Sequence, residues 1–191
     1  NGLSPEQNII GIALDGTGYG EDNTIWGGEI FTGNLYGLNR RLRIRPIKMP
    51  GGQKAVEEPY RMAISYIKEY LGEVPKDIPF YDTHKEKIPL INTILNKNIN
   101  TPLTSSTGRL FDAVSSLIGI KDTISFEAQA AIGLQMISEQ RLNDIYSINS
   151  YPIEINHKDN ILELNFQKLF EELINDIRKK EEKSLIGIKF H

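Results

Sequence analysis

An α/β fold is the architecture that the sequence predicts, and three observations carry the prediction. Residues 9–14 form a short run of branched apolar residues that ends at glycines, which indicates a buried strand. Residues 41–45 alternate charged and apolar side chains, the pattern of a half-buried strand. Residues 56–71 repeat apolar side chains at helical spacing, which predicts a helix with one buried face.

The glycine-rich stretch after the first strand is the first candidate site. Asp15 stands at the tip of this strand, Gly16, Thr17 and Gly18 follow it, and residues 24–31 read as the return strand. Successive backbone N–H groups in a glycine-rich turn form a concave site for an anion. A carboxylate beside that site is suited to hold a metal ion against the anion. The alternative is that Asp-Gly only makes the turn of a hairpin.

The first 72 residues follow one another as strand, strand, strand and helix. A loop at 1–5 leads into the first strand, and a turn at 51–52 follows the third. The helix 56–71 takes Pro59 in its first turn, where a missing N–H is harmless, and ends at Gly72. This order resembles the front half of a ribonuclease-H-like domain. The hairpin resembles the phosphate-binding hairpin of an actin-like ATPase domain.

The rest of the chain reads as an insertion followed by a mainly helical portion. Residues 73–103 carry four prolines, so we expect a linker around one short helix. Beyond this insertion we expect a helix from 105–107 to Gly119, a helix from Ser125 through Arg141, a hairpin of 151–155 with 161–166, and a helix over 166–177 with a solvated tail at 179–183. The predicted organisation is therefore a core at 1–72, an insertion at 73–103 and a helical portion with a hairpin at 104–191.

The start of the helix near residue 107 is the second candidate site. Hydroxyl groups and a glycine at 104–108 precede free N–H groups at the positive end of the helix, which suits a phosphate or a ribose. Asp112 lies about one turn further along, where a carboxylate can bridge ribose hydroxyls. Glu127, at the start of the next helix, is open to the same interpretation as a nucleotide contact. The alternative for all three is ordinary helix capping and stabilisation of the helix dipole.

Composition and charge exclude several classes of function. The net charge of −3 argues against a general nucleic-acid surface, and no apolar run is long enough to span a bilayer. The chain has no cysteine, which excludes disulfides and thiolate chemistry and fits the cytoplasm, where we expect this protein. His84, His157 and His191 lack metal-ligand spacing, so we expect them at the surface. The arginines at 40–45 are expected on a solvated strand face.

Six motifs together resemble the hydrogenase maturation carbamoyltransferase (HypF) family, in its C-terminal domain related to the universal tRNA threonylcarbamoyl transferase. They follow in family order: DGTGYG at 15–20, TIWGGE at 24–29, MPGG at 49–52, EPYRMA at 58–63, TSSTGRLFDA at 104–113 and FEAQAA at 126–131. The sequence departs from the family at Gln53, where Asp is common, and at Ala128, where Gly is common.

The resemblance implies an actin-like fold and chemistry on a carbamoyl-adenylate made from carbamoyl phosphate and ATP. It implies that the carbamoyl group passes to the C-terminal cysteine of the partner HypE and becomes the cyanide ligand of a nickel–iron centre. By family correspondence, Asp15 is a catalytic residue and a ligand of a divalent metal, iron or zinc. Residues 16–18 face the phosphate or carbamoyl group, and Asp112 and Glu127 contact the nucleotide. No nucleic acid or membrane is expected as a partner.

The departures from the family concern the metal site. Its paired histidine ligands precede residue 1 of this chain, and its last metal-binding aspartate follows residue 191. We therefore expect a fragment that holds about half of one site and is inactive alone. Two other functions stay open: an actin-like kinase or ATPase built on the same hairpin, and a non-catalytic piece that only binds the partner.

Overall fold

Seven strands of the chain form one mixed sheet in a computed structural model, which describes residue 2 and residues 4–191. The strands are β1 (Ile9–Tyr19), β2 (Ile25–Asn34), β3 (Gly37–Ile44), β4 (Ile47–Lys48), β5 (Leu103–Thr104), β6 (Glu154–Lys158) and β7 (Ile161–Asn165). Their order is β4–β5–β2–β3–β7–β6, and β1 pairs with β2 beside this path. Asn1 and Leu3 of the predicted first loop lie outside the described residues.

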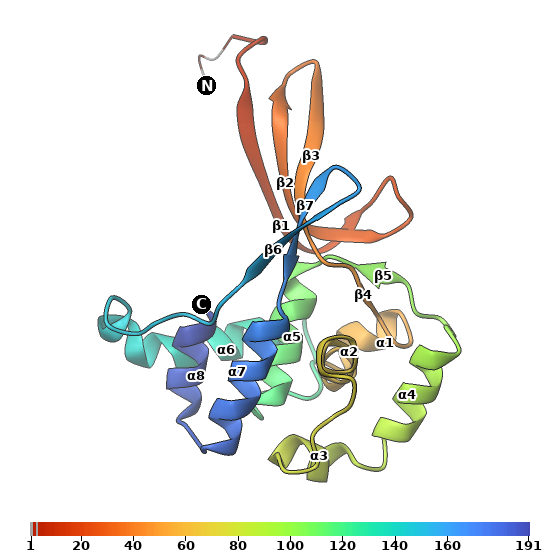
Figure 1. The fold of residues 1–191 in the computed structure, drawn as a ribbon, viewed down its shortest axis with the longest axis vertical. Helices are drawn as coiled ribbons and strands as arrows, with labels where there is room; N and C mark the ends of the chain where they lie inside the picture. The colour runs from red at the N-terminus through yellow and green to blue at the C-terminus, as the bar shows by residue number, and fades with distance from the viewer. Residues whose placement is uncertain (1, 3) are drawn as a thin grey trace.

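The helices gather at one end of the sheet, and strands β1, β2 and β3 project beyond them (Figure 1). The helices are α1 (Gln53–Glu57), α2 (Tyr60–Leu71), α3 (Pro79–His84), α4 (Ile88–Asn96), α5 (Thr107–Leu117), α6 (Gln129–Ser138), the 3-10 helix η1 (Glu139–Asp144), α7 (Gln167–Arg178) and α8 (Lys183–Phe190). Among the described residues, no helix has the length and apolar character needed to cross a membrane.

The apolar core lies around helix α2, which packs against both α5 and α7. Its centre is a stack of aromatic rings, with the centroid of Phe170 5.3 Å from that of Tyr66 and 5.6 Å from that of Tyr70. Phe170 and Tyr66 are fully buried. The predicted α/β architecture is therefore built around a helical core, and the sheet rises from it.

Several predicted boundaries are confirmed by their physical signals. Ser106 caps α5, and Gly119 ends it in a left-handed conformation with φ of +69°. Gly72 ends α2 in the same way, with φ of +87°. The predicted hairpin near the C-terminus is formed by β6 and β7, although β6 spans 154–158 instead of the predicted 151–155, and its turn at Asp159 and Asn160 has positive φ angles.

Other predicted elements differ in the structure. Pro59 does not lie inside one long helix, because it separates the short α1 from α2 and caps the latter. The helix predicted from Ser125 begins only at Gln129, and its last part is the 3-10 helix η1. The terminal helix α8 was not predicted from the sequence.

The first strand is formed as predicted, but it is not buried. Ile10 is 72% exposed, Ile12 is 66% exposed and Leu14 is 67% exposed. The reason is that β1 lies at an edge of the sheet, where its pairing partner among the described residues is β2. An apolar run indicates that the side chains of a strand are to be buried, but it does not show which part of a protein packs against them.

The segment 73–103 is packed into the core and is not a linker around one helix. It forms α3 and α4, and several of its apolar side chains are buried, namely Val74, Ile78, Phe80, Ile88, Ile91 and Leu95. Two of its four prolines begin these helices instead of breaking them, since a proline stands at the first or second position of each. The division of the chain into three parts stays a prediction.

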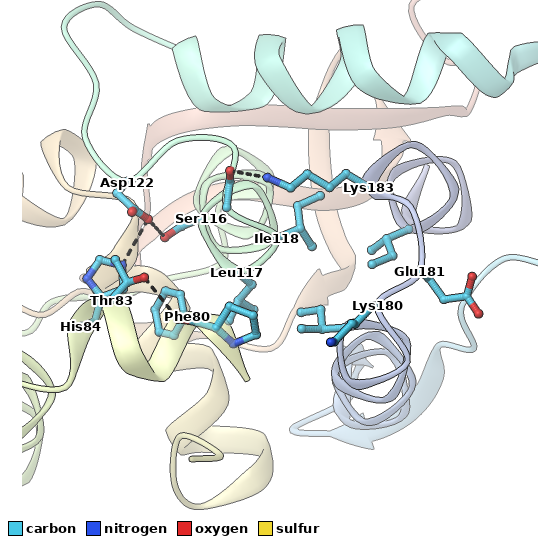
Figure 2. A pocket seen from close by; sticks show the side chains of 14 residues that line it. Phe80, Thr83, His84, Ser116, Leu117, Ile118, Asp122, Lys180, Glu181 and Lys183 are labelled. Atoms are coloured by element: carbon cyan, nitrogen blue, oxygen red, sulfur yellow. Dashed lines mark hydrogen bonds and ion pairs between the residues drawn. The ribbon is translucent and has the colours of Figure 1, made fainter. Parts of the chain in front are cut away.

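His84 is only 2% exposed, so its predicted surface position is wrong, whereas His157 and His191 are exposed. The His84 ring stacks on Tyr60 at 4.9 Å, and its Nε2 lies 3.3 Å from Asp122. Figure 2 shows His84 and Asp122 at one end of a cavity of about 300 Å³ between α3, α5 and the start of α8. The histidine is buried because α3 packs into the core. The sequence did not indicate this packing, since the residues around His84 are typical of a loop.

Candidate functional site

Residues 15–17 form a bulge in strand β1. Pairing with β2 stops after Leu14 and resumes at Gly18, so the three residues of the bulge face the single residue Gly27 of β2. The predicted glycine-rich turn is therefore wrong in its position, since the strand continues past it and the hairpin turns at residues 20–24. A bulge of this kind re-aims side chains out of the regular strand pattern.

The start of α5 packs directly against the bulge. The hydroxyl oxygen of Ser106 caps the helix by accepting the N–H of Arg109 at 3.2 Å. The same hydroxyl lies 2.8 Å from the carbonyl oxygens of Asp15 and Gly16, to which it donates a shared hydrogen bond. A Cβ atom on Gly108 would lie 3.0 Å from the Cα of Gly16, so this backbone contact depends on glycine. The two candidate stretches therefore lie together in the fold.

Asp112 is enclosed inside the protein at 1% exposure, beside an equally buried Arg109. Its Oδ2 lies 3.1 Å from Nη2 of Arg109, which is ion-pair distance without the alignment of a hydrogen bond. Burial raises the pKa of Asp112 to about 6, and the positive charge of Arg109 offsets part of this rise. Asp112 is thus near the bulge but not at the surface where a ribose was expected.

Glu127 lies beside the bulge on the exposed segment before α6. Its Oε1 is 4.0 Å, and Nη2 of Arg109 is 3.6 Å, from the position that a Cβ on Gly16 would occupy. The neighbouring Ala128 caps α6 with φ of +60°, a left-handed conformation that favours glycine. The glycine that is common in the family at this position therefore suits the backbone better than the alanine of this chain.

Asp15 is exposed in the bulge, and its Oδ1 accepts the N–H of Gly16 at 2.6 Å. Thr17 beside it is exposed as well. Within residues 2 and 4–191, no group of three or more His, Asp or Glu side chains is arranged to hold a metal ion. The donors of this part of the chain do not by themselves fit the expected metal, since Asp15 stands alone.

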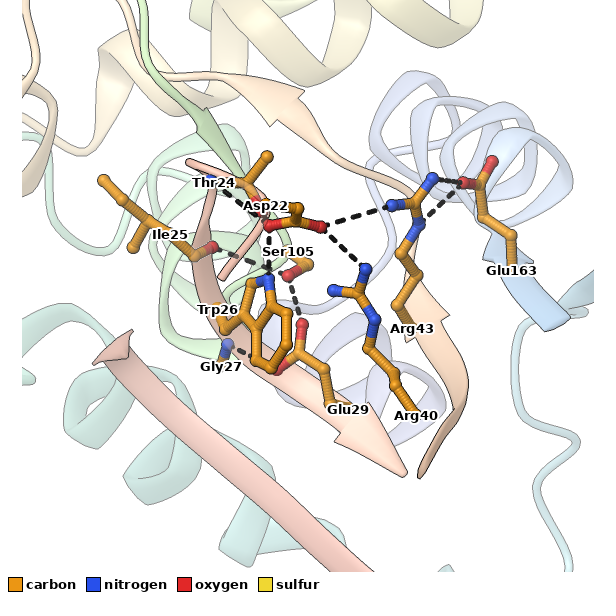
Figure 3. A network of polar contacts seen from close by, with 10 residues as sticks. All are labelled: Asp22, Thr24, Ile25, Trp26, Gly27, Glu29, Arg40, Arg43, Ser105 and Glu163. Carbon is orange, nitrogen blue, oxygen red and sulfur yellow. Dashed lines mark hydrogen bonds and ion pairs between the residues drawn. The ribbon is translucent and has the colours of Figure 1, made fainter. Parts of the chain in front are cut away.

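Asp22, in the turn after β1, ties that turn to the two following strands (Figure 3). Its carboxylate accepts hydrogen bonds from Thr24 Oγ1 at 2.6 Å, Trp26 Nε1 at 2.8 Å and Arg40 Nη2 at 2.7 Å. Burial alone raises the pKa of Asp22, but these three hydrogen bonds outweigh burial and hold it well below its usual range. The turn that follows the bulge is therefore fixed by polar contacts.

The arginines of β3 were expected on a solvated face, and two of them are instead held in polar contacts. Arg43 donates to Glu163 from Nε at 3.1 Å and from Nη2 at 3.0 Å, and its side chain is 12% exposed. Arg40 stacks over the ring of Trp26 at 4.2 Å. Arg41 is exposed, as predicted.

Sequence reasoning missed the contribution of Glu29, of Arg109 and of the Ser106 hydroxyl to the bulge. Glu29 is 1% exposed, and its Oε2 accepts the N–H groups of Gly27 and Gly28 at 2.7 and 2.8 Å. One signal was available, because Glu29 is a carboxylate in the middle of a predicted strand. Charged residues are seldom buried unless they are paired or hydrogen-bonded.

Comparisons with known proteins identify the family. The family model described as "Carbamoyltransferase, Kae1-like Domain, second subdomain" matches residues 11–191. This chain belongs to the HypF carbamoyltransferase family. Carbamoyltransferase HypF of Synechocystis sp. is 34% identical over 204 residues, which cover 97% of this chain and 25% of the relative. Probable carbamoyltransferase HypF of Methanocaldococcus jannaschii is 34% identical over 178 residues, which cover 91% and 22%.

Two solved HypF structures share the fold. A full-length HypF in its phosphate- and nucleotide-bound form aligns with a TM-score of 0.81 and 31% identity, over 97% of this chain and 24% of that one. HypF of T. kodakarensis aligns with a TM-score of 0.75 and 26% identity, over 94% and 24%. The predicted family and the α/β fold of its Kae1-like domain are therefore confirmed. The chain spans about a quarter of the length of these HypF relatives.

Proposed function

We propose that this chain supplies part of the transfer site of a HypF-type carbamoyltransferase. The full-length parent makes a carbamoyl-adenylate from carbamoyl phosphate and ATP, with release of phosphate and pyrophosphate. It then passes the carbamoyl group to the thiol of the C-terminal cysteine of HypE, with release of AMP, in the cytoplasm. The transferred group becomes the cyanide ligand of a nickel–iron hydrogenase centre. The observation that carries the proposal is the contact between the bulge and the start of α5, made through the hydroxyl of Ser106.

The groups around the bulge suit a carbamoyl or phosphoryl oxygen. Thr17 offers an exposed hydroxyl, and we propose that backbone N–H groups of residues 16–18 turn to the ligand, that of Gly16 in place of its hydrogen bond to Asp15. Such donors stabilise negative charge that develops as an acyl group is transferred. Glu127 lies beside them, and its exposed carboxylate is suited to accept a hydrogen bond from a hydroxyl of the nucleotide. Asp112 is proposed as a ribose contact only in a conformation that exposes its carboxylate, because this carboxylate is enclosed here.

Asp15 is proposed as the catalytic carboxylate, presented to solvent by the bulge. In the parent it would also be one ligand of a divalent iron or zinc ion, whose other ligands come from outside this chain. Such an ion polarises a carbonyl or phosphoryl oxygen. Since the chain alone offers one donor to this metal, we expect the isolated fragment to be inactive.

A transfer assay with the full-length parent tests the proposal. Purified HypE is incubated with the parent, carbamoyl phosphate and ATP, and the mass of its C-terminal peptide is measured. We expect a carbamoyl adduct on the cysteine, and none on a matched HypE whose C-terminal cysteine is replaced by serine. Unmodified HypE together with phosphorylation of a small acceptor from ATP would replace the transferase by an actin-like kinase. If HypE binds to the parent but stays unmodified, and no acceptor is phosphorylated, the chain has a non-catalytic, partner-binding role.

A further inference from the structure

Glu29 is a buried carboxylate without a cation, and its partners all belong to the walls of the site. Its Oε2 accepts the backbone N–H groups of Gly27 and Gly28, and its Oε1 accepts the hydroxyl of Ser105. Among the described residues, no lysine or arginine forms an ion pair with Glu29. Burying an unpaired charge is costly, so a carboxylate is retained in such a place only where several hydrogen bonds satisfy it.

The bulge explains why the N–H of Gly27 needs an acceptor. Three residues of β1 face Gly27, so the regular ladder is interrupted at this point. A buried backbone N–H without a partner costs free energy, and main-chain donors in folded proteins are nearly always satisfied. The carboxylate of Glu29 is the acceptor for Gly27 at the interruption (Figure 3), and it also accepts the N–H of the neighbouring Gly28.

Glu29 joins the two segments that contact the bulge, which are β2 at Gly27 and the start of α5. A Cβ on Gly27 would collide with the carbonyl oxygen of Asp15 and lie 3.1 Å from the Cα of Ser106, so β2 is in direct backbone contact with both. The carbonyl of Gly27 also accepts the hydroxyl of Thr107 at 2.7 Å. On the other side, Ser105 precedes Ser106, whose hydroxyl holds the carbonyls of the bulge.

From this arrangement we infer that Glu29 is a positioning residue for the transfer site. Its carboxylate locks β2 to the start of α5, and the bulge is thereby held in the conformation that presents Asp15. Glu29 acts through hydrogen bonds and not through its charge, because each of its contacts is to a neutral donor. The inference rests on the proposed function for its catalytic readout, but its structural readout is independent of that function.

Three variants of the full-length parent test this inference. Glu29→Ala removes all three hydrogen bonds, so the bulge loses its fixed position and kcat/KM for carbamoyl transfer falls on the order of 100-fold. Glu29→Gln keeps an acceptor for the two N–H groups and turns its amide to Ser105, so kcat/KM stays within about threefold of the wild type. Glu163→Ala is the matched control, because Glu163 is a buried carboxylate of the same sheet, is 4% exposed and accepts its hydrogen bonds from Arg43 of β3 instead of from β2 or the start of α5. It lowers the melting temperature and leaves KM and kcat unchanged.

Hydrogen exchange of the backbone at residues 13–19 gives the second readout. Faster exchange there in Glu29→Ala than in Glu163→Ala, at equal loss of melting temperature, supports positioning. Equal exchange with wild-type kinetic constants would overturn it, and so would a folded Glu29→Gln variant as inactive as Glu29→Ala, because charge would then be required.

If Glu29→Ala does not fold, Ser105→Ala serves in its place. It removes one hydrogen bond and is expected to lower kcat/KM about fivefold. Wild-type kinetics and exchange in this variant would contradict the inference. A wild-type parent that does not modify HypE fails the proposed function alone, since hydrogen exchange still decides the role of Glu29.

Discussion

The helices beneath the sheet and the strand β1 above them bury very different shares of their apolar side chains. Phe170 and Tyr66 at the centre of the helices are fully buried, whereas Ile10 and Leu14 of β1 are 72% and 67% exposed. Apolar burial dominates stability, so most of the folding free energy resides in the helices. The bulge is held by a few hydrogen bonds at the junction of the two regions. A substitution in the helices should therefore change stability, and one in the bulge should change function.

The largest change in the free energy of unfolding is expected from Phe170→Ala, in the helical region. The ring of Phe170 stacks on two tyrosines in the core, and deleting a buried phenylalanine leaves a cavity that costs about 3–5 kcal/mol of unfolding free energy. Urea unfolding of the 191-residue chain measures this loss. The matched control is Phe126→Ala, whose side chain is 55% exposed and whose loss should stay within about 0.5 kcal/mol. Equal losses for the two variants would contradict the account of where stability resides.

Asp112, at the junction, should give a smaller effect that depends on pH. Its pKa is about 6 in the folded chain and 3.8 when unperturbed, so the folded state keeps a proton that the unfolded state loses. Its contribution to stability is therefore present below about pH 4 and is lost as the pH rises to about 6, by up to about 3 kcal/mol. Asp112→Asn cannot ionise and should remove this loss. Urea unfolding at pH 4, 5, 6 and 7 compares the two proteins.

The expected result is a gap in favour of Asp112→Asn that widens as the pH rises from 4 to 7. Carboxylates whose pKa is lowered, such as Asp122, change stability in the opposite direction at lower pH, but they are shared by both proteins and cancel in the comparison. A gap that stays constant with pH would mean that burial does not disfavour the charge of Asp112.

The same contrast separates what the sequence could predict from what it could not. The helices α2, α5 and α7 follow from local spacing and from end signals such as Gly72 and Gly119, since their apolar faces lie within one segment. The exposure of β1 does not follow, because cover for an apolar strand comes from elsewhere in a protein. The burial of His84 likewise depends on the packing of α3 against distant residues.

For the site, the motifs marked the correct stretches but not their geometry. The glycines at 16 and 18 indicated a departure from regular strand, and both a turn and a bulge fit that pattern. Register with β2 decides between them, and register is a property of two strands. The role of Glu29 depends on that register in turn, because one of the two N–H groups that it accepts belongs to Gly27, the residue opposite the bulge.

The bulge presents Asp15 for function, while the helices carry stability. Asp15→Ala in the full-length parent tests it most directly, with transfer to HypE and the melting temperature measured on the same preparation. Asp15 is exposed and its one side-chain hydrogen bond is to the adjacent N–H, so the stability change should stay within about 1 kcal/mol. Carbamoyl transfer should be lost, whereas Glu21→Ala, which removes an exposed carboxylate in the following turn, should retain it. An unfolded Asp15→Ala protein, or a folded one with full transfer activity, would contradict the claim.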